Sequence, residues 1–493
     1  MPYNEVIWMS GLLKLLVCDG AIMRLTLLNL LVVFGCGVAS AQHFTSVQIR
    51  DVPHVVQKTD FCGEACVASW LQKIGVPADQ DAVFDASGLN PKLGRGCYTK
   101  EMVTALKNLG FDPGQVWYQV PVASYTTQVG TLWKALHSDL QRGVASIICM
   151  RTSDGPGATE HFRLILGYDA TKDEVIYHEP AEHGGAYQRM PRVELLKLWP
   201  LKYQRDQWTL VRFALDMKQR PQISPSVTFT SADYAQHIMD LKSRLASLSS
   251  HSSDFTILIE PPFVVVGDEA AEVVQKRVAQ TVRWATQRLK AEYFSKDPNE
   301  VLDVWLFKDR SSYDANTVRL FGQKPTTPYG FYSSTDGALV MNIATGGGTL
   351  VHEIVHPFIE SNFPNCPSWF NEGLGSLYEQ SSSRDGRIIG LTNWRLAGLQ
   401  EAIRADSVPS FGTLCSTTTH QFYRQDPGTN YSQARYLCYY LQEKGLLQKY
   451  YQDFVANQKS DPTGYKTLQK TLGNPDMKVF KRDWENYVAS LRF

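Results

Sequence analysis

Apolar residues recur with a helical period through much of the second half of the chain. Val274, Val278, Val282 and Leu289 repeat at intervals of four or seven residues, which predicts an amphipathic helix that Asp268 caps and that ends near residue 294. Short apolar runs predict strands on either side of this helix. The predicted strands cover 255–259, 263–266, 302–307 and 338–343, and further helices are predicted at 394–405, 431–443, 447–455 and 475–491.

The first half has a different pattern, in which short strands dominate its later part. A helix is predicted at 63–74 after an extended segment, and another at 132–140 before a strand at 145–150. Two more strands follow, joined by a turn near 171–173, with His161 at the start of one and Glu179 at the end of the next. The order of elements favours an α+β fold in each half.

A change in composition between the two halves indicates a linker between two domains. Residues 219–253 contain two prolines and a serine-rich run, preceded by the apolar spacing of Ile238, Leu241 and Leu245, which indicates a helical or partly ordered linker. The predicted organisation is an N-terminal extension and signal (1–41), a first domain (43–218), a linker (219–253) and a second domain (254–493).

The N-terminal segment has the parts of a secretory signal. Met23 and Arg24 precede an apolar run at 25–38 and a small-x-small site that ends at Ala41, so export is expected and cleavage would follow Ala41. Residues 1–22 do not fit such a signal and indicate either a start codon at Met23 or a longer anchor. A lipid anchor on Cys36 is a further alternative. Beyond this signal no segment is apolar enough to predict a membrane span.

Charge and cysteine content narrow the class of protein. The 493 residues carry 49 basic and 49 acidic side chains, which gives no electrostatic reason to expect nucleic acid as a partner. Seven of the nine cysteines follow Ala41. This odd number leaves at least one free thiol in an exported protein.

A metal-binding pattern lies in the second half, at His352-Glu353-Ile354-Val355-His356. Two histidines four residues apart project from one face of a helix and can bind one metal ion, while Glu353 is placed to accept a proton from a water that zinc activates. Catalytic zinc usually has three protein ligands. Glu372, on a second predicted helix at 369–380, is the candidate for the third.

HEIVH followed by PSWFNEG resembles the gluzincin metallopeptidases of the peptidase-MA-like type. The resemblance covers about 255–490 and implies a mixed sheet before the metal helix, His352, His356 and Glu372 as zinc ligands, and Glu353 as general base. Pro357 departs from the pattern, and a kink is expected there because proline lacks a backbone donor. Tyr431 is considered as a donor to the oxyanion, with a structural role as the alternative.

A second set of candidate catalytic residues lies in the first half. Cys62 precedes a predicted helix, whose N-terminus lowers a thiol pKa and favours the nucleophilic thiolate. Gln57 is placed to donate to an oxyanion, and Glu179 on the neighbouring strand is placed to orient His161 as the base.

These residues, in Q-x4-C-G-x-A-C, H-F-x4-G-Y-D and E-P-A, resemble the papain-like C39 peptidases over about 50–200. The resemblance implies Cys62 as nucleophile, His161 as base, Gln57 as oxyanion donor and Glu179 as the orienting acid. Glu179 stands where the family usually has aspartate, so its longer side chain puts its hold on His161 in doubt. Because no later membrane spans accompany this region, processing of secretion leaders is not expected.

The sequence therefore predicts an exported zinc-dependent peptidase that acts on peptides or proteins, with a C39-like domain that is either a second protease or a peptide-binding module. A different class stays open, namely a cell-envelope binding protein in which both sites are vestigial.

Overall fold

The computed structural model describes residues 44–493 apart from 222–228, 249–254 and 426–428. The predicted signal and Cys36 lie outside the described residues. Among the helices described, none is both long and apolar enough to cross a membrane.

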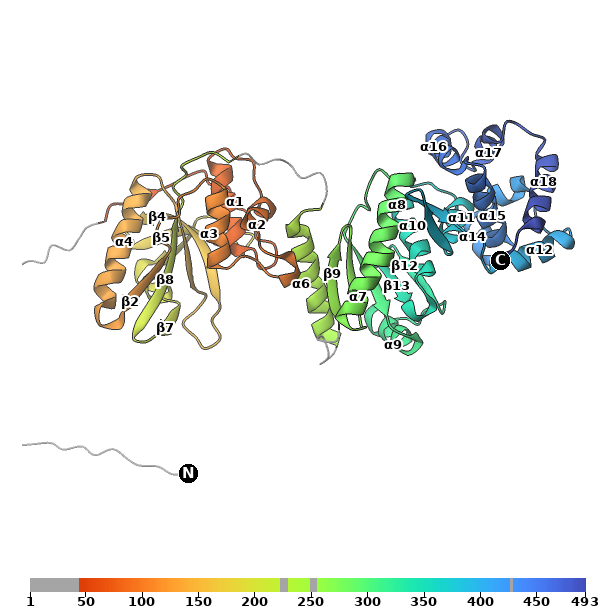
Figure 1. The fold of residues 1–493 in the computed structure, drawn as a ribbon. Coiled ribbons are helices and arrows are strands. Elements are labelled where there is room, and N and C mark those ends of the chain that lie inside the picture. Colours follow the sequence, from red (N-terminus) through yellow and green to blue (C-terminus); the bar gives the residue numbers. More distant parts are fainter. Residues whose placement is uncertain (1–43, 222–228, 249–254, 426–428) are drawn as a thin grey trace, which may run out of the picture. The chain divides into compact units, whose positions relative to one another are not determined.

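The first part is built on an antiparallel eight-stranded sheet in the order β2-β8-β3-β4-β5-β6, with β1 beside β4 and β7 beside β8. Side chains of alternate residues on β3 and β4 leave the sheet on opposite faces. Ile147, Cys149, Phe162 and Leu164 pack in one core with α1 and α3, while α4 lies against the other face (Figure 1). The strands are β1 (Val47–Gln48), β2 (Trp117–Pro121), β3 (Ser146–Arg151), β4 (Glu160–Asp169), β5 (Glu174–His178), β6 (Gln188–Pro191), β7 (Lys202–Gln204) and β8 (Gln207–Ala214).

The helices of this part agree with the apolar spacing, with one difference in length. α4 spans Tyr125–Gln141 and is longer than the helix predicted at 132–140. Its polar first turns hid the start, although buried Val129 and Trp133 continue the helical spacing toward it. The other helices are α1 (Cys62–Lys73), α2 (Gln80–Ser87), α3 (Thr99–Asn108) and α5 (Arg192–Leu198).

The second part contains a mixed five-stranded sheet in the order β12-β13-β11-β10-β9. β10, β11 and β13 are parallel, and β9 and β12 are antiparallel edge strands. Helices cover both faces, so the central strands are buried on both sides. The strands are β9 (Thr256–Glu260), β10 (Phe263–Gly267), β11 (Leu302–Phe307), β12 (Gly330–Ser333) and β13 (Ala338–Asn342).

One face of this sheet packs on α6 (Ser231–Leu248) and α9 (Arg310–Phe321). The other packs on α7 (Ala271–Arg277), α8 (Trp284–Glu292) and α10 (Gly348–Asn362). Within the segment predicted as a linker, α6 buries Ile238, Leu241 and Leu245 in the same core as Val264 and Trp305 of the sheet. The ordered part of that segment therefore contributes to the core of the second sheet, while its Ala232 and Ala235 lie in the core of the first part.

The long helix predicted to start at Asp268 is divided into α7 (Ala271–Arg277), a π-helical turn at Val278–Arg283 and α8 (Trp284–Glu292). The prediction that Asp268 caps it is wrong. Ala270 occupies the N-cap, and the Asp268 carboxylate instead accepts hydrogen bonds from the Lys308 amide and the Ser312 hydroxyl.

The chain after β13 is helical apart from one small hairpin, β14 (Ser381–Arg384) and β15 (Arg387–Gly390). α10 (Gly348–Asn362) and α11 (Ser368–Leu377) follow β13 directly, and α11 packs closely on α15 (Asn430–Glu443). The remaining helices are α12 (Arg395–Arg404), α13 (Phe411–Cys415), α14 (Thr419–Arg424), α16 (Leu447–Asn457), α17 (Tyr465–Thr471) and α18 (Met477–Ser490).

Candidate active sites

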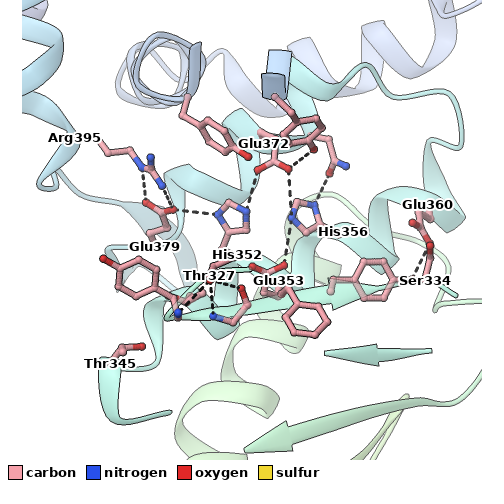
Figure 2. A pocket seen from close by; sticks show the side chains of 18 of the residues that line it. Thr327, Ser334, Thr345, His352, Glu353, His356, Glu360, Glu372, Glu379 and Arg395 are labelled. Atoms are coloured by element: carbon pink, nitrogen blue, oxygen red, sulfur yellow. Dashed lines mark hydrogen bonds and ion pairs between the residues drawn. The ribbon is translucent and has the colours of Figure 1, made fainter. Parts of the chain in front are cut away.

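The residues predicted as metal ligands converge at the contact between α10 and α11. One donor atom each from His352, His356 and Glu372 lies within 4.8 Å of the others. The Nε2 atom of His352 lies 3.1 Å from Glu372 Oε2, and that of His356 lies 4.0 Å from Glu372 Oε1 (Figure 2). Three donors of this kind on two successive helices form a geometry that one metal ion can fill.

The second nitrogen of each imidazole contacts an oxygen acceptor. His356 Nδ1 is 2.9 Å from Asn371 Oδ1, which can only accept, so this ring carries its proton on Nδ1 and presents Nε2 as a lone pair. His352 Nδ1 lies 3.3 Å from Glu379 Oε1. Both rings thus turn Nε2 toward Glu372, as metal-binding histidines do when their other nitrogen is held.

Pro357 does not end the metal helix. α10 runs through it to Asn362, and His352 and His356 stay one turn apart with ring centroids separated by 4.9 Å. The helix is therefore not interrupted at Pro357, and both histidines keep their places on one face.

Two glycines permit the close approach of these elements. A Cβ on Gly375 of α11 would lie 3.1 Å from the His352 ring, and one on Gly348 would lie only 2.0 Å from the backbone oxygen of Glu379. The glycines in GGGTL and NEGLG therefore let α10, α11 and the Glu379 segment pack around the first histidine.

The donor set of the site suits a cation. Glu353, Glu372 and Glu379 are all buried. Burial opposes ionisation of Glu372, but His356 and His352 outweigh it and lower its pKa to about 2. Arg395 donates two hydrogen bonds to Glu379 and so offsets that carboxylate. Two imidazoles beside buried carboxylates are ligands that suit a divalent metal ion such as zinc.

Several residues of this site carried no assignment from the sequence. Asn371 directly precedes Glu372, so its position in the W-F-N-E-G pattern was a usable signal. Tyr423, which donates to Glu372 Oε1 at 2.5 Å, and Arg395 come from later helices that only the tertiary fold brings here. Tyr431 lines the same cavity, with the Arg395 guanidinium 5.2 Å from its ring centroid.

In the first part, β4 and the end of β5 bring His161 and Glu179 together. His161 Nε2 lies 2.5 Å from Glu179 Oε1, so the longer glutamate side chain reaches the ring. Arg163, two residues along the same strand face, donates to the other oxygen of Glu179 at 2.7 Å. Although burial opposes it, these partners lower the pKa of Glu179 to about 2. Arg163 was missed, yet its i+2 spacing from His161 was visible in the sequence.

Cys62 is the first residue of α1, and its thiol lies beside the backbone amide of Phe162, the residue after His161. The prediction of a lowered thiol pKa is wrong. Burial raises the pKa of Cys62 to about 12, against the smaller lowering by the Phe162 and Gly63 amides, and the carboxylates of Glu64 and Asp60 raise it further. Loss of hydration here outweighs the helix N-terminus.

Gln57 lies in the extended segment before α1. Its backbone amide donates to the carbonyl of Pro180 at 2.9 Å, which fixes this segment beside the residue that follows Glu179. All seven cysteines in the described part of the chain are free thiols.

A comparison with protein families finds a match over residues 49–206 to the Peptidase_C39 like family. The N-terminal part of the chain is therefore similar to the C39-like peptidases. This match covers the segment that holds Gln57, Cys62, His161 and Glu179, and it supports assignment to the peptidases, which are hydrolases.

Other comparisons add little to this. No curated protein matches the chain. Among solved structures the chain is similar to the peptidase domain of Streptococcus ComA, described as a bi-functional ABC transporter involved in a quorum sensing pathway, with 16% identity over 36% of this chain and 100% of that one, and a TM-score of 0.21. A likeness this distant does not bear on function.

Proposed function

We propose that the chain is an exported zinc-dependent peptidase whose catalytic centre is built on α10 and α11, with a C39-like domain that is a second thiol protease or a peptide-binding module. The observation that carries the metal site is the convergence of His352, His356 and Glu372 donors within 4.8 Å. The N-terminal sequence up to Ala41 supports export.

In this proposal the two imidazoles and Glu372 hold zinc, which, when bound, supplies a Lewis acid that activates water and polarises a peptide carbonyl. Glu353, whose Oε2 lies 3.7 Å from His356 Nε2, accepts a proton from the attacking water and passes it to the leaving amine. Asn371 Oδ1 accepts a hydrogen bond from His356 Nδ1, and Glu379 Oε1 lies 3.3 Å from His352 Nδ1.

Two tyrosines line the cavity, and their contacts assign them different roles. The hydroxyl of Tyr423 is engaged with Glu372, so it orients that carboxylate. Tyr431 lies beside it in the cavity wall and is the candidate donor to the developing oxyanion.

Two alternatives remain for the function of the C39-like domain. The hydrogen bond between His161 and Glu179 favours a working thiol protease, whereas the raised pKa of Cys62 favours a module that binds peptide without cleaving it. The third candidate is a cell-envelope binding protein in which both sites are vestigial. A full zinc content contradicts this candidate, and a substoichiometric zinc content supports it.

The test is zinc content and hydrolysis of peptides by the purified full chain, compared among wild type, Glu353→Gln and Cys62→Ala. We expect about one zinc per chain in all three, with hydrolysis reduced by a factor of about 10² to 10⁴ in Glu353→Gln. Loss confined to Glu353→Gln makes the C39-like domain an accessory. Loss in Cys62→Ala on a different peptide makes it a second protease. A wild type without zinc and without activity overturns the proposal.

The export proposal has a separate test. Expression with the natural N-terminus, followed by cell fractionation and N-terminal sequencing, should give a chain that begins at residue 42 outside the cytoplasm. A cytoplasmic chain that keeps residues 23–41 contradicts it, and a lipid on Cys36 supports the anchored alternative.

A further inference from the structure

The cavity in front of the two histidines has a volume of about 930 Å³ and extends beyond them on both sides. Arg395 and Glu379 lie at one end, and Glu360 and Ser334 lie at the other (Figure 2). The first end is neutralised, because Arg395 and Glu379 bind each other through two hydrogen bonds. The chemistry of the second end is different.

Glu360 continues the helix face that carries the histidines. It lies four residues after His356 and eight after His352 on α10, so all three side chains point to the same side of the helix. At 1.5 Å per residue, Glu360 lies about 6 Å along the helix axis from His356. In an extended peptide this is a distance of about two residues from the bond that would be cleaved.

The carboxylate of Glu360 is held in place but not neutralised. The hydroxyl of Tyr332, on the edge strand β12, donates to its Oε2 at 2.8 Å. Tyr332 is itself placed next to the site, since its ring stacks on that of His356 with centroids 6.4 Å apart. Among the described residues that line the cavity, Arg395 is the only lysine or arginine, and it is at the far end.

We propose that Glu360, oriented by Tyr332, is a specificity-determining residue that binds a cationic group of the substrate within about two residues of the scissile bond. The cation is a lysine or arginine side chain or a free amino terminus, and the ammonium or guanidinium group pairs with the Glu360 carboxylate. This inference rests on the proposed function for the position of the scissile bond.

A solvated surface glutamate would look similar in exposure alone. One observation separates Glu360 from that case: its carboxylate accepts a hydrogen bond from a hydroxyl of the cavity wall. A peptide lying along the cavity would cover this pair and strengthen its interaction with a cation by excluding water.

The experiment measures peptide binding to the full-length Glu353→Gln chain by fluorescence anisotropy at low salt. The probes are capped peptides that differ at one position, lysine or norleucine, and an uncapped norleucine peptide with a free amino terminus. We expect one of the cationic peptides to bind about fivefold more tightly than the capped norleucine peptide. Which of the two does so identifies the source of the cation.

Substitutions at Glu360 then test whether this residue causes the preference for a cationic peptide. Glu360→Gln, in the same background, should bring the ratio close to one, Glu360→Lys should favour a matched glutamate peptide, and high salt should weaken the preference. Glu401→Gln, which removes an exposed carboxylate outside the cavity lining, is the matched control and should keep the ratio.

Equal binding of charged and neutral peptides by the Glu353→Gln chain overturns the inference, and so does an equal loss of preference in Glu360→Gln and Glu401→Gln. The same ratio in kcat/KM, compared between wild type and Glu360→Gln, extends the test to turnover. Binding separates this inference from the proposed function. A preference that depends on Glu360 in a chain without zinc or hydrolysis supports the cation site and rejects the peptidase.

Discussion

The two candidate sites of this chain are assembled in different ways. His352, His356 and Glu372 come from two successive helices, and their donor atoms already face one point. Cys62 comes from a helix start, whereas His161 lies on a strand and Glu179 directly after the next strand, roughly a hundred residues later; of these three, only His161 and Glu179 form a direct hydrogen bond. The donor atoms of the candidate metal site thus converge already, whereas the partly buried thiol of the other site has a raised pKa.

The largest expected effect concerns this neutral thiol. With a pKa near 12, the thiolate fraction of Cys62 at pH 8 is roughly a thousandfold below that of a cysteine with a pKa of 9. Alkylation of Cys62 by iodoacetamide, followed by mass spectrometry, should be slow at neutral pH and rise about tenfold per pH unit up to the alkaline range. Rapid alkylation near pH 6 would reveal a thiolate paired with His161 and remove the contrast between the sites.

The raised pKa of Cys62 also affects the free energy of unfolding. Because the native state keeps its proton while the unfolded thiol loses it, the contribution of Cys62 to the free energy of unfolding falls as pH rises from about 9 to about 12. Cys62→Ser should reduce this alkaline loss, measured by urea unfolding at several pH values.

The next effect is on metal affinity. A structural zinc site gains roughly 10 to 16 kcal/mol, which is about 2.5 to 5 kcal/mol per ligand for three or four ligands. Glu372→Gln should therefore weaken zinc binding by at least about 100-fold in a competition titration with a chelator. Glu401→Gln is the control, and unchanged affinity in Glu372→Gln would remove Glu372 from the ligand set.

A comparable effect on stability is expected in the C39-like domain. The pKa of Glu179 is lowered to about 2, so its ionised form stabilises the native state above the unfolded pKa of about 4.5, and this contribution is lost as pH falls toward 2. Glu179→Gln should lower the free energy of unfolding by about 3 kcal/mol near neutral pH.

The pH dependence of the free energy of unfolding distinguishes a loss of ion pairs in Glu179→Gln from a packing defect. The difference between wild type and Glu179→Gln should shrink below pH 4 if the ion pairs with Arg163 and His161 are its cause. A difference that stays constant from pH 7 to pH 3 would assign it to packing.

The smallest effect concerns the residue that orients His356. Asn371→Ala removes the acceptor at Nδ1 and leaves the three ligands in place, so zinc affinity should fall only about tenfold. Asn371→Asp should restore the affinity because it keeps an acceptor at the same position. Equal zinc affinity in wild type and Asn371→Ala would show that the hydrogen bond does not position the ring.

The accuracy of sequence-based prediction differed between elements for physical reasons. Four of the five strands before α10, and the four C-terminal helices that were predicted, follow from short-range periodicity, and the structure places them where the apolar spacing predicts. The edge strand β12 was not predicted. The predictions of a helix cap at Asp268 and of the start of α4 were wrong. Asp268 is engaged by the Ser312 hydroxyl, a contact over 44 residues, and the polar first turns of α4 concealed its beginning.

The positions of His352 and His356 on one helix face were set by the sequence alone, because four residues are about one helical turn and no distant contact is needed. The pairing of His161 with Glu179 was also readable, since a hairpin aligns neighbouring strands. The tertiary structure decided what surrounds these residues. It brings Tyr423 and Arg395 from later helices to the carboxylates of the candidate metal site, and it partly buries the Cys62 thiol so that lost hydration outweighs the helix N-terminus. Burial and long-range contacts depend on the whole packed chain, and no local pattern contains them.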